Sequence, residues 1–549
     1  MNKKPKYGAF AINLKQTGVG YDKRTQTVYR RFQFTDYLGN EVELLFAAGK
    51  HKDREGELIR QLENAGCLLP LNRKEIAAII ASLDEQTTTD NFNVVSQFGW
   101  LDDEAVFCTP LEVYGSPSVS LETDFSEITA DHTFGRKGKL KLWRQLIARM
   151  AFGNRVMTFA LAAAFAGPLL KPLNVESGGF QLWGDSSTGK TTCLRAAMSV
   201  WAGNVVTWNM TINALDQLGS AYSDLLLPLD EVGAAPGGIK QVLDTTYRLC
   251  GNGAKRRFTD TNSLRTNRSW FMSTAEKPST ELAQREGVDC DPGQLIRLTD
   301  IHADGGKSMG AFENLHSARS PGEFSDRIKA AAQEQYGTAG HAYLKKLIRD
   351  MAANHNGLRA WLERRMAFYQ QHAPQLGLGG FHERISKRFA LVYAAGALAI
   401  RYDILPFSRS GLFKAIRYCH SQMEVEALAT FTRTAIDAVD LVKKNFKEHE
   451  ADFLDLKTEV LQKNQGDTDA RIGYISYNGG EREYLVELSV FKSFICQGYD
   501  WRKVLKDLRA RGHINLNKGG KSTVFRTIPT AEGSKRQRVI SISEQFLKD

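Results

Sequence analysis

A glycine-rich segment that directly follows the apolar run Phe180–Trp183 has the residue types needed to bind phosphate. It fits the pattern Gly-x-x-x-x-Gly-Lys-Thr, in which the two glycines let the backbone fold into a concave loop whose N–H groups point at phosphate oxygens. A helix that begins at the end of this loop would turn its positive end toward the anion. The residues expected to contact a bound triphosphate are Gly184, Asp185, Ser186, Ser187, Thr188, Gly189, Lys190, Thr191 and Thr192.

Two carboxylates later in the chain suit a phosphoryl-transfer site. The apolar segment 224–229 predicts a strand, and it ends in Asp230 and Glu231. We expect Lys190 to reach the β- and γ-phosphates, and Thr191 and Asp230 to hold Mg²⁺. Glu231 would orient and activate the attacking water, which favours hydrolysis over the chemistry of a small-molecule kinase. The alternatives are a chance glycine-rich turn and a strand that ends at a charged surface.

The next predicted strand, 269–273, also ends in polar residues. The hydroxyl of Ser273 or Thr274 could sense the γ-phosphate and help position the water. Arg285 and Arg297 follow on the next helix and the next predicted strand, 294–301. A planar guanidinium neutralises charge on a transferred phosphoryl group, so either arginine could complete the site of a neighbouring subunit. For each of them, a surface arginine is the alternative.

A helical region over residues 316–440 is predicted by four periodic segments, 324–335, 341–353, 358–372 and 385–400. These helices would form a lid over a nucleotide. Arg384 and Arg388 stand at the start of the last segment, where a lid arginine could touch phosphate. Cations that only interact with a helix end would give the same pattern, although they favour the other end of a helix.

Two basic regions are candidates to contact DNA. The first is a polar turn at 251–268, which carries Lys255, Arg256 and Arg257 and could project as a hairpin against a nucleic-acid backbone. The second is the C-terminal stretch, where two short helices and a two-stranded ribbon indicate a winged helix. Its basic residues are Arg502, Lys503, Lys506, Arg509, Arg511, Lys518, Lys521, Lys535 and Arg536. A solvated loop and a protein-binding winged helix are the respective alternatives.

The composition is that of a globular protein with room for several domains. The chain has 549 residues, of which 42% are hydrophobic, and its net charge of +10 favours polyanionic partners. The longest apolar run, 156–170, is too short to span a membrane and predicts a buried helix. Seven scattered cysteines and an N-terminus without an apolar signal core indicate reduced thiols, no zinc site and a cytoplasmic location.

The order of these patterns predicts an α/β protein of several parts. An N-terminal α+β accessory region would open with strands at 7–12, 28–34 and 41–46, followed by helices at 53–65 and 73–83. A β-rich connector containing Trp100, expected to be a core residue, would lead into the nucleotide-binding core. The expected divisions are 1–90 (accessory region), 91–139 (connector), 140–315 (core), 316–440 (lid), 441–480 (linker, most flexible at 464–480) and 481–549 (winged helix).

Over most of residues 90–400 the chain resembles domain-of-unknown-function family 927, a group of AAA+ ATPases typified by replication helicases of mobile genetic elements and related to the MCM helicases. The resemblance rests on Gly99–Trp100, Phe107–Pro110, Gly178–Thr192, Leu229–Glu231, Ser273–Glu276 and Gly293–Leu298. Ala275 stands where the family usually has Gly, a mild departure. The resemblance implies an ATP- and Mg²⁺-dependent, ring-shaped and hexameric DNA motor, with a hairpin that reaches into the channel. No primase-like acidic motif is apparent, so priming would need a separate primase or replication protein.

The leading hypothesis is therefore an ATP-dependent DNA helicase or translocase that acts on single-stranded or forked DNA in replication of a phage, plasmid or integrated element. One alternative is a regulatory or defence ATPase that switches assembly states without unwinding. The other is an initiator that binds origin DNA through its winged helix and uses ATP only to stabilise an oligomer.

Overall fold

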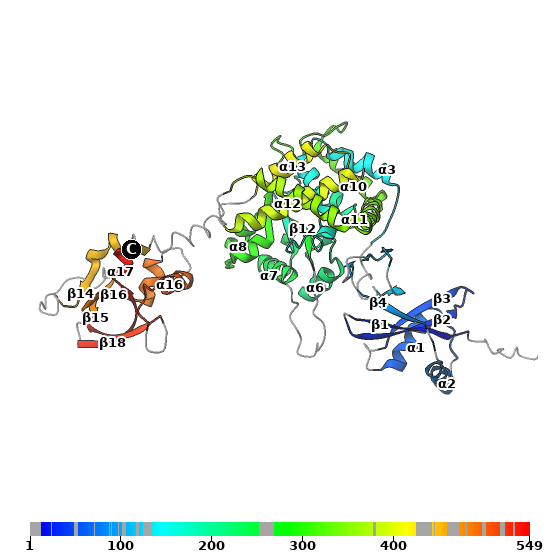
Figure 1. The fold of residues 1–549 in the computed structure, drawn as a ribbon, viewed down its shortest axis with the longest axis horizontal. Coiled ribbons are helices and arrows are strands. Elements are labelled where there is room, and N and C mark those ends of the chain that lie inside the picture. Colours follow the sequence, from blue (N-terminus) through cyan, green and yellow to red (C-terminus); the bar gives the residue numbers. More distant parts are fainter. Residues whose placement is uncertain are drawn as a thin grey trace, which may run out of the picture. The chain divides into compact units, whose positions relative to one another are not determined.

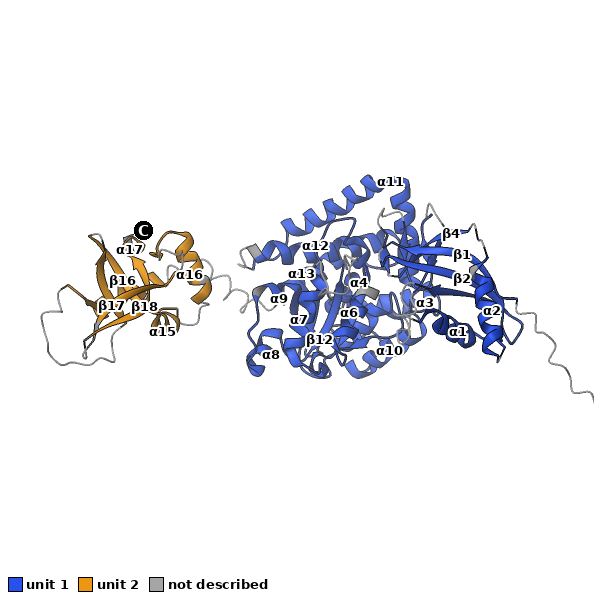
Figure 2. Cartoon of the chain, turned by 90° about the horizontal axis from the view of Figure 1, so that it is seen from below, with its two compact units in different colours: residues 1–376, 380–424 blue, residues 377–379, 425–549 orange. Residues whose placement is uncertain are grey.

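The chain forms two compact units, which are shown in Figure 2. Unit 1 consists of residues 1–376 and 380–424, and unit 2 consists of residues 377–379 and 425–549. No described helix has the length and apolarity needed to cross a membrane. The computed structural model describes residues 13–23, 25–48, 53–70, 72–86, 88, 90–96, 98–101, 106–116, 120–124, 134–251, 268–376, 380–423, 442–443, 445–457, 472–478, 480–496, 501–516, 522–530 and 533–548.

The N-terminal part of unit 1 is a mixed sheet with the strand order β3-β2-β1-β4-β8 (Figure 1). The strands are β1 (Lys15–Asp22), β2 (Thr27–Thr35), β3 (Glu41–Ala47), β4 (Asn91–Val95) and β8 (Leu121–Thr123). Helices α1 (Arg54–Asn64) and α2 (Arg73–Asp84) confirm the two predicted helices. The predicted strand at 7–12 lies outside the described residues. Because β4 and β8 pair in parallel within this sheet, the expected division at residue 90 cuts through it.

A small three-stranded sheet is inserted in the sequence between β4 and β8 of the N-terminal sheet. It consists of β5 (Gly99–Trp100), β6 (Phe107–Cys108) and β7 (Val113–Tyr114). Trp100 is 1% exposed, and its indole N–H donates to the carbonyl of Pro168 at 2.7 Å. This confirms the prediction that Trp100 is a core residue.

Asp224 joins this connector to the core. Its carboxylate is fully buried and accepts two hydrogen bonds from the Arg268 guanidinium, at 2.6 and 2.7 Å. It also accepts the backbone N–H of Trp100 at 3.0 Å. Gly99, at φ +94°, leaves the space for this contact, since a Cβ there would lie 2.4 Å from the carboxylate. This ion pair therefore links β5 to two segments that lead into core strands, one at Asp224 and one at Arg268.

The core is built on a five-stranded parallel sheet with the order β10-β11-β12-β9-β13. Its strands are almost entirely buried, as expected for a parallel sheet that is covered on both faces. They are β9 (Gly178–Trp183), β10 (Val206–Thr207), β11 (Leu226–Asp230), β12 (Trp270–Ala275) and β13 (Leu298–His302). The predicted strand 294–301 is partly wrong, since residues 292–297 form helix α9 (Pro292–Arg297) behind an Asp291 capping box.

The helices that follow the core strands in sequence are α5 (Lys190–Met198), α6 (Ile212–Ala221), α7 (Gly238–Cys250) and α8 (Ser279–Glu286). Upstream, α3 (Leu140–Trp143) precedes α4 (Arg155–Ala164), whose residues from Val156 onward are buried. The apolar run at 156–170 is therefore buried, as predicted, and its helix ends at Ala164. All seven cysteines are free.

The helical region of unit 1 contains four long helices. They are α10 (Pro321–Glu334), α11 (Thr338–Gln371), α12 (Gly380–Arg401) and α13 (Arg409–Ser421). Helix α11 joins two of the predicted segments across a kink at Asn354. Phe389 of α12 packs against Phe180 of β9, with ring centroids 4.9 Å apart. The expected helices are present, and α12 is part of the packed body of the core.

Unit 2 is a five-stranded sheet with the order β14-β15-β16-β18-β17. Its strands are β14 (Phe453–Asp455), β15 (Gly473–Asn478), β16 (Glu481–Glu487), β17 (Val524–Thr530) and β18 (Gly533–Ser543). Helix α15 (Leu488–Val490) continues as a π-helical turn to Ile495, and α16 (Trp501–Ala510) and α17 (Gln545–Lys548) follow. The segment 464–480, interpreted as a flexible linker, contains β15, which pairs with β16.

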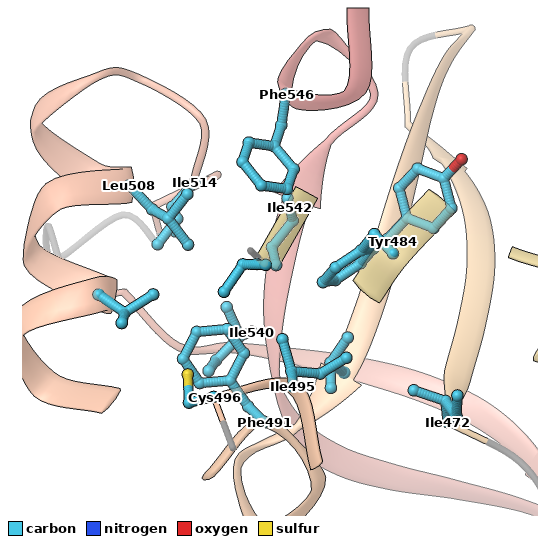
Figure 3. Close-up of a cluster of buried hydrophobic side chains, with 14 of the residues drawn as sticks. Ile472, Tyr484, Phe491, Ile495, Cys496, Leu508, Ile514, Ile540, Ile542 and Phe546 are labelled. Atoms are coloured by element: carbon cyan, nitrogen blue, oxygen red, sulfur yellow. The ribbon is translucent and has the colours of Figure 1, made fainter. Parts of the chain in front are cut away.

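One face of this sheet carries the core of unit 2. Ile540 and Ile542 of β18 and Tyr484 of β16 share a buried cluster with Leu508 of α16 and Phe491, as Figure 3 shows. The two helices and the two-stranded ribbon predicted from sequence are therefore present in one domain, together with three strands, β14, β15 and β16, that the sequence did not predict.

Candidate functional site

The glycine-rich loop connects β9 to α5 and has the backbone that a concave phosphate loop requires. Gly184, Ser187 and Gly189 have positive φ values of 154°, 63° and 91°. A Cβ at Gly189 would lie 2.6 Å from the ring of Phe312, so only glycine fits there. Helix α5 begins at Lys190, and its N-terminal end therefore borders the loop.

Lys190 lies inside this loop. It is 8% exposed, and its Nζ donates to the carbonyl oxygens of Gly184 at 2.8 Å and Asp185 at 2.7 Å. Burial lowers the pKa of Lys190, while the nearby carboxylates, Glu276 and Glu231 first among them, act in the opposite direction. The loop thus holds a cation at its centre, where it can pair with a phosphate group.

Three hydroxyl and carboxyl groups from different elements meet beside the loop. Thr191, at the start of α5, donates to Oδ1 of Asp230 at 3.0 Å. Thr274, near the end of β12, donates to the same oxygen at 2.6 Å. The backbone N–H of Glu231 donates to the Thr274 hydroxyl at 2.9 Å. The parallel order β11-β12-β9 produces this meeting, since the carboxyl ends of these strands lie at one edge of the sheet.

Thr274 and Ser273 therefore have different surroundings, although the sequence left both open as sensor residues. Successive side chains of a strand point to opposite faces of the sheet. Thr274 faces Asp230, whereas the Ser273 hydroxyl accepts the indole N–H of Trp208 at 2.9 Å and is fully buried. The sequence does not show which face of the sheet each side chain takes, so only the fold distinguishes Ser273 from Thr274.

Glu231 has a left-handed backbone, with φ 62° and ψ 82°, and is exposed. A non-glycine residue in this region costs roughly 1–3 kcal/mol and is typical of functional sites. The strained turn directs the chain away from β11 directly after Asp230. The Glu231 side chain is thus accessible beside the loop, where a general base must be.

Asp230 and Thr191 together can hold a divalent cation. Among the described residues, no group of three or more His, Cys, Asp or Glu side chains could hold a metal by itself. Mg²⁺ is ordinarily bound by one or two carboxylates together with waters and phosphate oxygens. One carboxylate and one hydroxyl are a donor set of that kind, and they fit Mg²⁺ better than zinc.

Two further features of the site were not predicted from the sequence. The Lys277 Nζ lies 3.8 Å from Oδ1 of Asp185, which places a second cation at the rim of the loop. The chain at 310–311 supports the loop from the other side, where the Ala311 N–H donates to the Thr188 carbonyl at 2.8 Å. The only sequence signal for Lys277 was its position directly after a strand of the core sheet.

The two candidate trans-acting arginines lie elsewhere in the described structure. Arg285 is exposed near the end of α8 and pairs with Glu281 one turn earlier. The Arg297 guanidinium stacks on Tyr247 at 4.4 Å and donates to the Gly293 carbonyl at 2.7 Å. Arg297 precedes β13 and so lies at the amino end of the sheet, whereas the loop lies at the carboxyl end.

Arg384 and Arg388 do not reach the loop of their own chain, so the prediction that they contact phosphate there is wrong. Arg388 is 2% exposed and donates to the Ile296 carbonyl and, at 3.4 Å, to the Thr299 hydroxyl. Burial lowers its pKa to about 10. A Cβ on Gly178, the first residue of β9, would lie 2.6 Å from its Nε. That end of β9 is about 20 Å from the loop at about 3.3 Å per residue. Arg384 pairs with Glu176, at the same end.

The structure describes only some of the residues that were predicted to contact DNA. Lys255, Arg256, Arg257 and Lys521 lie outside the described residues, as does the side chain of Lys503. Arg502 and Lys506 are exposed on α16, and Arg509 extends the same stripe. Val504 and Leu508 on the opposite face of α16 are buried in the core of unit 2. Helix α16 thus presents a basic face to the solvent.

Residues 12–269 match the DUF927 family model, a domain of unknown function. The match includes the N-terminal sheet, the loop and Asp230–Glu231, and it ends before β12, whereas the sequence resemblance was placed over residues 90–400. No curated protein matches the sequence.

A solved structure described as "SCCmec type IV Cch - active helicase" is similar in fold along nearly the whole chain. The TM-score is 0.60 at 16% sequence identity, and the alignment covers 97% of this chain and 94% of the other. The chain therefore has a mixed α/β fold shared with that helicase.

Proposed function

We propose that this protein is an ATP-dependent DNA helicase or translocase of the AAA+ class that acts in replication of a mobile genetic element. The observation that carries the proposal is the hydrogen-bonded group of Thr191, Asp230 and Thr274 beside a loop that encloses Lys190. This arrangement joins a phosphate cradle, a metal ligand pair and a sensor hydroxyl in one site.

ATP and Mg²⁺ fit the residues that are present. Lys190 and the loop N–H groups would bind the β- and γ-phosphates, and Thr191 and Asp230 would hold the metal. Bound Mg²⁺ neutralises charge on the phosphates during transfer. Glu231 would accept the proton of the attacking water, and Thr274 holds the backbone of Glu231 in place through its hydroxyl.

The arrangement of arginines supports assembly into a ring, which we propose to be a homohexamer. None of the four candidate arginines contacts this chain's own loop, so a guanidinium would come from a neighbouring copy. Arg285 suits that role better than Arg297, because its side chain is 59% exposed and Arg297 is stacked on Tyr247. Arg285→Ala should then abolish hydrolysis in the assembly without weakening nucleotide binding.

Unit 2 supports a role in DNA binding. The order of strands β16, β18 and β17, with the helices between β16 and β17, supports the proposal of a winged helix in which α16 would be the recognition helix. Residues 481–549 contain fourteen Lys and Arg against eight Asp and Glu, so much of the chain's positive charge is located there. Arg502, Lys503, Lys506 and Lys521 are the proposed contacts in unit 2, and Lys255, Arg256 and Arg257 in the core.

A forked-duplex unwinding assay with ATP and with a non-hydrolysable analogue tests the proposal. We expect strand separation with ATP only, and its loss in Lys190→Ala. Lys240→Ala, which removes an exposed lysine of α7, is the matched control and should unwind normally.

Other results would identify other functions. Hydrolysis that single-stranded DNA does not stimulate, without strand separation, would indicate a regulatory ATPase. Retention of one specific duplex site without unwinding would indicate an initiator.

A further inference from the structure

We propose that Phe525, with Arg536 and Arg538, forms a stacking site for the unpaired bases of single-stranded DNA on the β17–β18 ribbon of unit 2. The inference deepens the proposed function and rests on it for the choice of DNA as the ligand. It assigns the ribbon a preference for single strands that a basic surface alone would not have.

The position of Phe525 follows from strand alternation. Its neighbours Val524 and Ile528 are buried in a cluster with Leu485 and Val539. Phe525 points to the opposite face of the sheet and is 57% exposed. A single exposed aromatic residue is not unusual by itself. Phe525 differs from an isolated exposed ring because two arginines flank it.

Two arginines of β18 flank the ring on the same face. Arg538 is directly opposite Phe525 in the strand register, and the Arg536 guanidinium lies over the ring at 5.3 Å from its centroid. Both are exposed, and within the described residues neither forms an ion pair with a carboxylate. Strands β17 and β18 contain no Asp or Glu. Arg538 donates from Nε to the Thr523 hydroxyl at 2.9 Å, and a phosphate group is a suitable further partner for both cations.

The site lies on the side of the sheet that carries α16. Ile540 and Ile542 continue the face of Arg538 along β18, and they belong to the buried cluster that contains Leu508 of α16 (Figure 3). Arg502, Lys506 and Arg509 are exposed on the other face of α16. A bound strand could therefore contact cations on both elements of one domain.

An exposed aromatic ring beside exposed cations matches both components of single-stranded DNA, its phosphates and its bases. Phosphates pair with arginine and lysine, and the face of an unpaired base stacks on the ring. In a duplex, base faces are covered by neighbouring bases, so the ring has nothing to stack on away from an end. The site should therefore distinguish single strands from duplex through Phe525, while the arginines contribute to both.

Fluorescence anisotropy with the full-length protein, in the absence of nucleotide, tests this inference. The probes are a labelled oligothymidylate, an abasic strand of the same length and a duplex. Phe525→Ala should bind the oligothymidylate roughly five- to hundred-fold more weakly. Its affinity for the abasic strand and the duplex should be unchanged. Phe525→Tyr should retain the wild-type affinity because it retains the ring.

Two further variants separate stacking from charge and from local structure. Thr527→Ala, on the same face of the same strand, is the matched control and should bind all three probes normally. Arg538→Gln should reduce the salt dependence of binding by about one counterion, whereas Phe525→Ala should leave that slope unchanged.

An equal loss of affinity for abasic and normal strands, or an equal loss for the duplex, would overturn the inference, as would an unchanged affinity of Phe525→Ala for the oligothymidylate. Failure of the proposed motor activity gives a different result. In that case the protein would bind single strands through Phe525 and still not unwind a fork. Conversely, unwinding by a Phe525→Ala protein with normal single-strand affinity would refute only the stacking site.

Discussion

The hydroxyl of Thr274 offers the sharpest test of the candidate active site. It donates to Asp230 at 2.6 Å and accepts the backbone N–H of Glu231 at 2.9 Å. Thr274→Val keeps the β-branched shape and the volume that a buried strand position needs, and it removes both hydrogen bonds. The variant therefore perturbs the position of the two carboxylates and little else.

The size of the effect follows from these contacts. A hydrogen bond to a charged group contributes about 1.5–3 kcal/mol. If the Thr274 contacts hold Asp230 and Glu231 in the geometry of the transition state, their loss should lower kcat roughly 10- to 100-fold. The Kd for ATP should change little, because Lys190 and the loop are unaffected.

Steady-state ATP hydrolysis and nucleotide binding, measured on the same preparations, decide the outcome. Thr274→Ser keeps the hydroxyl and should retain most of the activity. Ser273→Ala is the matched control, since that hydroxyl accepts from Trp208 and does not contact the carboxylates. A Thr274→Val protein that hydrolyses ATP at the wild-type rate, or an equal loss in Ser273→Ala, would refute the assignment of Thr274.

Three further predictions concern residues outside the reacting groups. Asp224→Asn should lower the free energy of unfolding by up to about 3 kcal/mol, measured by denaturant titration, because it breaks the ion pair with Arg268, whose side chain is 24% exposed. Arg388→Met should leave the Kd for ATP unchanged by calorimetry, and a large loss of affinity would restore Arg388 as a phosphate contact. Burial raises the pKa of Glu483, but hydrogen bonds from Arg526 and Ser541 and the Arg526 charge outweigh this effect, so the net pKa is lowered. The stability that ionised Glu483 gives to the protein should therefore be present above the pKa of this residue in the unfolded chain, about 4.3, and should be lost as the pH falls through its lower pKa in the folded protein. In unfolding curves recorded by circular dichroism, Glu483→Gln should weaken this dependence of stability on acid pH.

Much of the fold could be predicted from periodicity and turn residues. Most strands of the core, the two N-terminal helices, the buried helix at 156–164 and the helices α10, α11 and α12 were expected from the sequence, whereas α13 matches none of the predicted segments and residues 292–297 form a helix where a strand was expected. Errors arose where pairing partners are distant in sequence. Strands β4 and β15 were placed in a connector and a linker because nothing local shows that β4 pairs with β1, or β15 with β16.

For the site, the sequence by itself determined the chemistry. Gly184, Gly189 and Lys190 predict a loop for phosphate, and Asp230–Glu231 predict a metal ligand and a base, because backbone freedom and functional groups are properties of the residues themselves. The match of residues 12–269 to the DUF927 family model agrees with the resemblance in those motifs.

Only the tertiary structure decided which residues meet. It selected Thr274 over Ser273, since strand register determines the face on which a side chain lies. It also placed Arg384 and Arg388 at the amino end of β9, because the sequence of a helix does not determine at which end of a sheet the helix begins. It also brought Arg536 over Phe525, from the facing strand. Residue types fix the chemistry that is possible, whereas distances between residues far apart in sequence depend on how the strands are ordered.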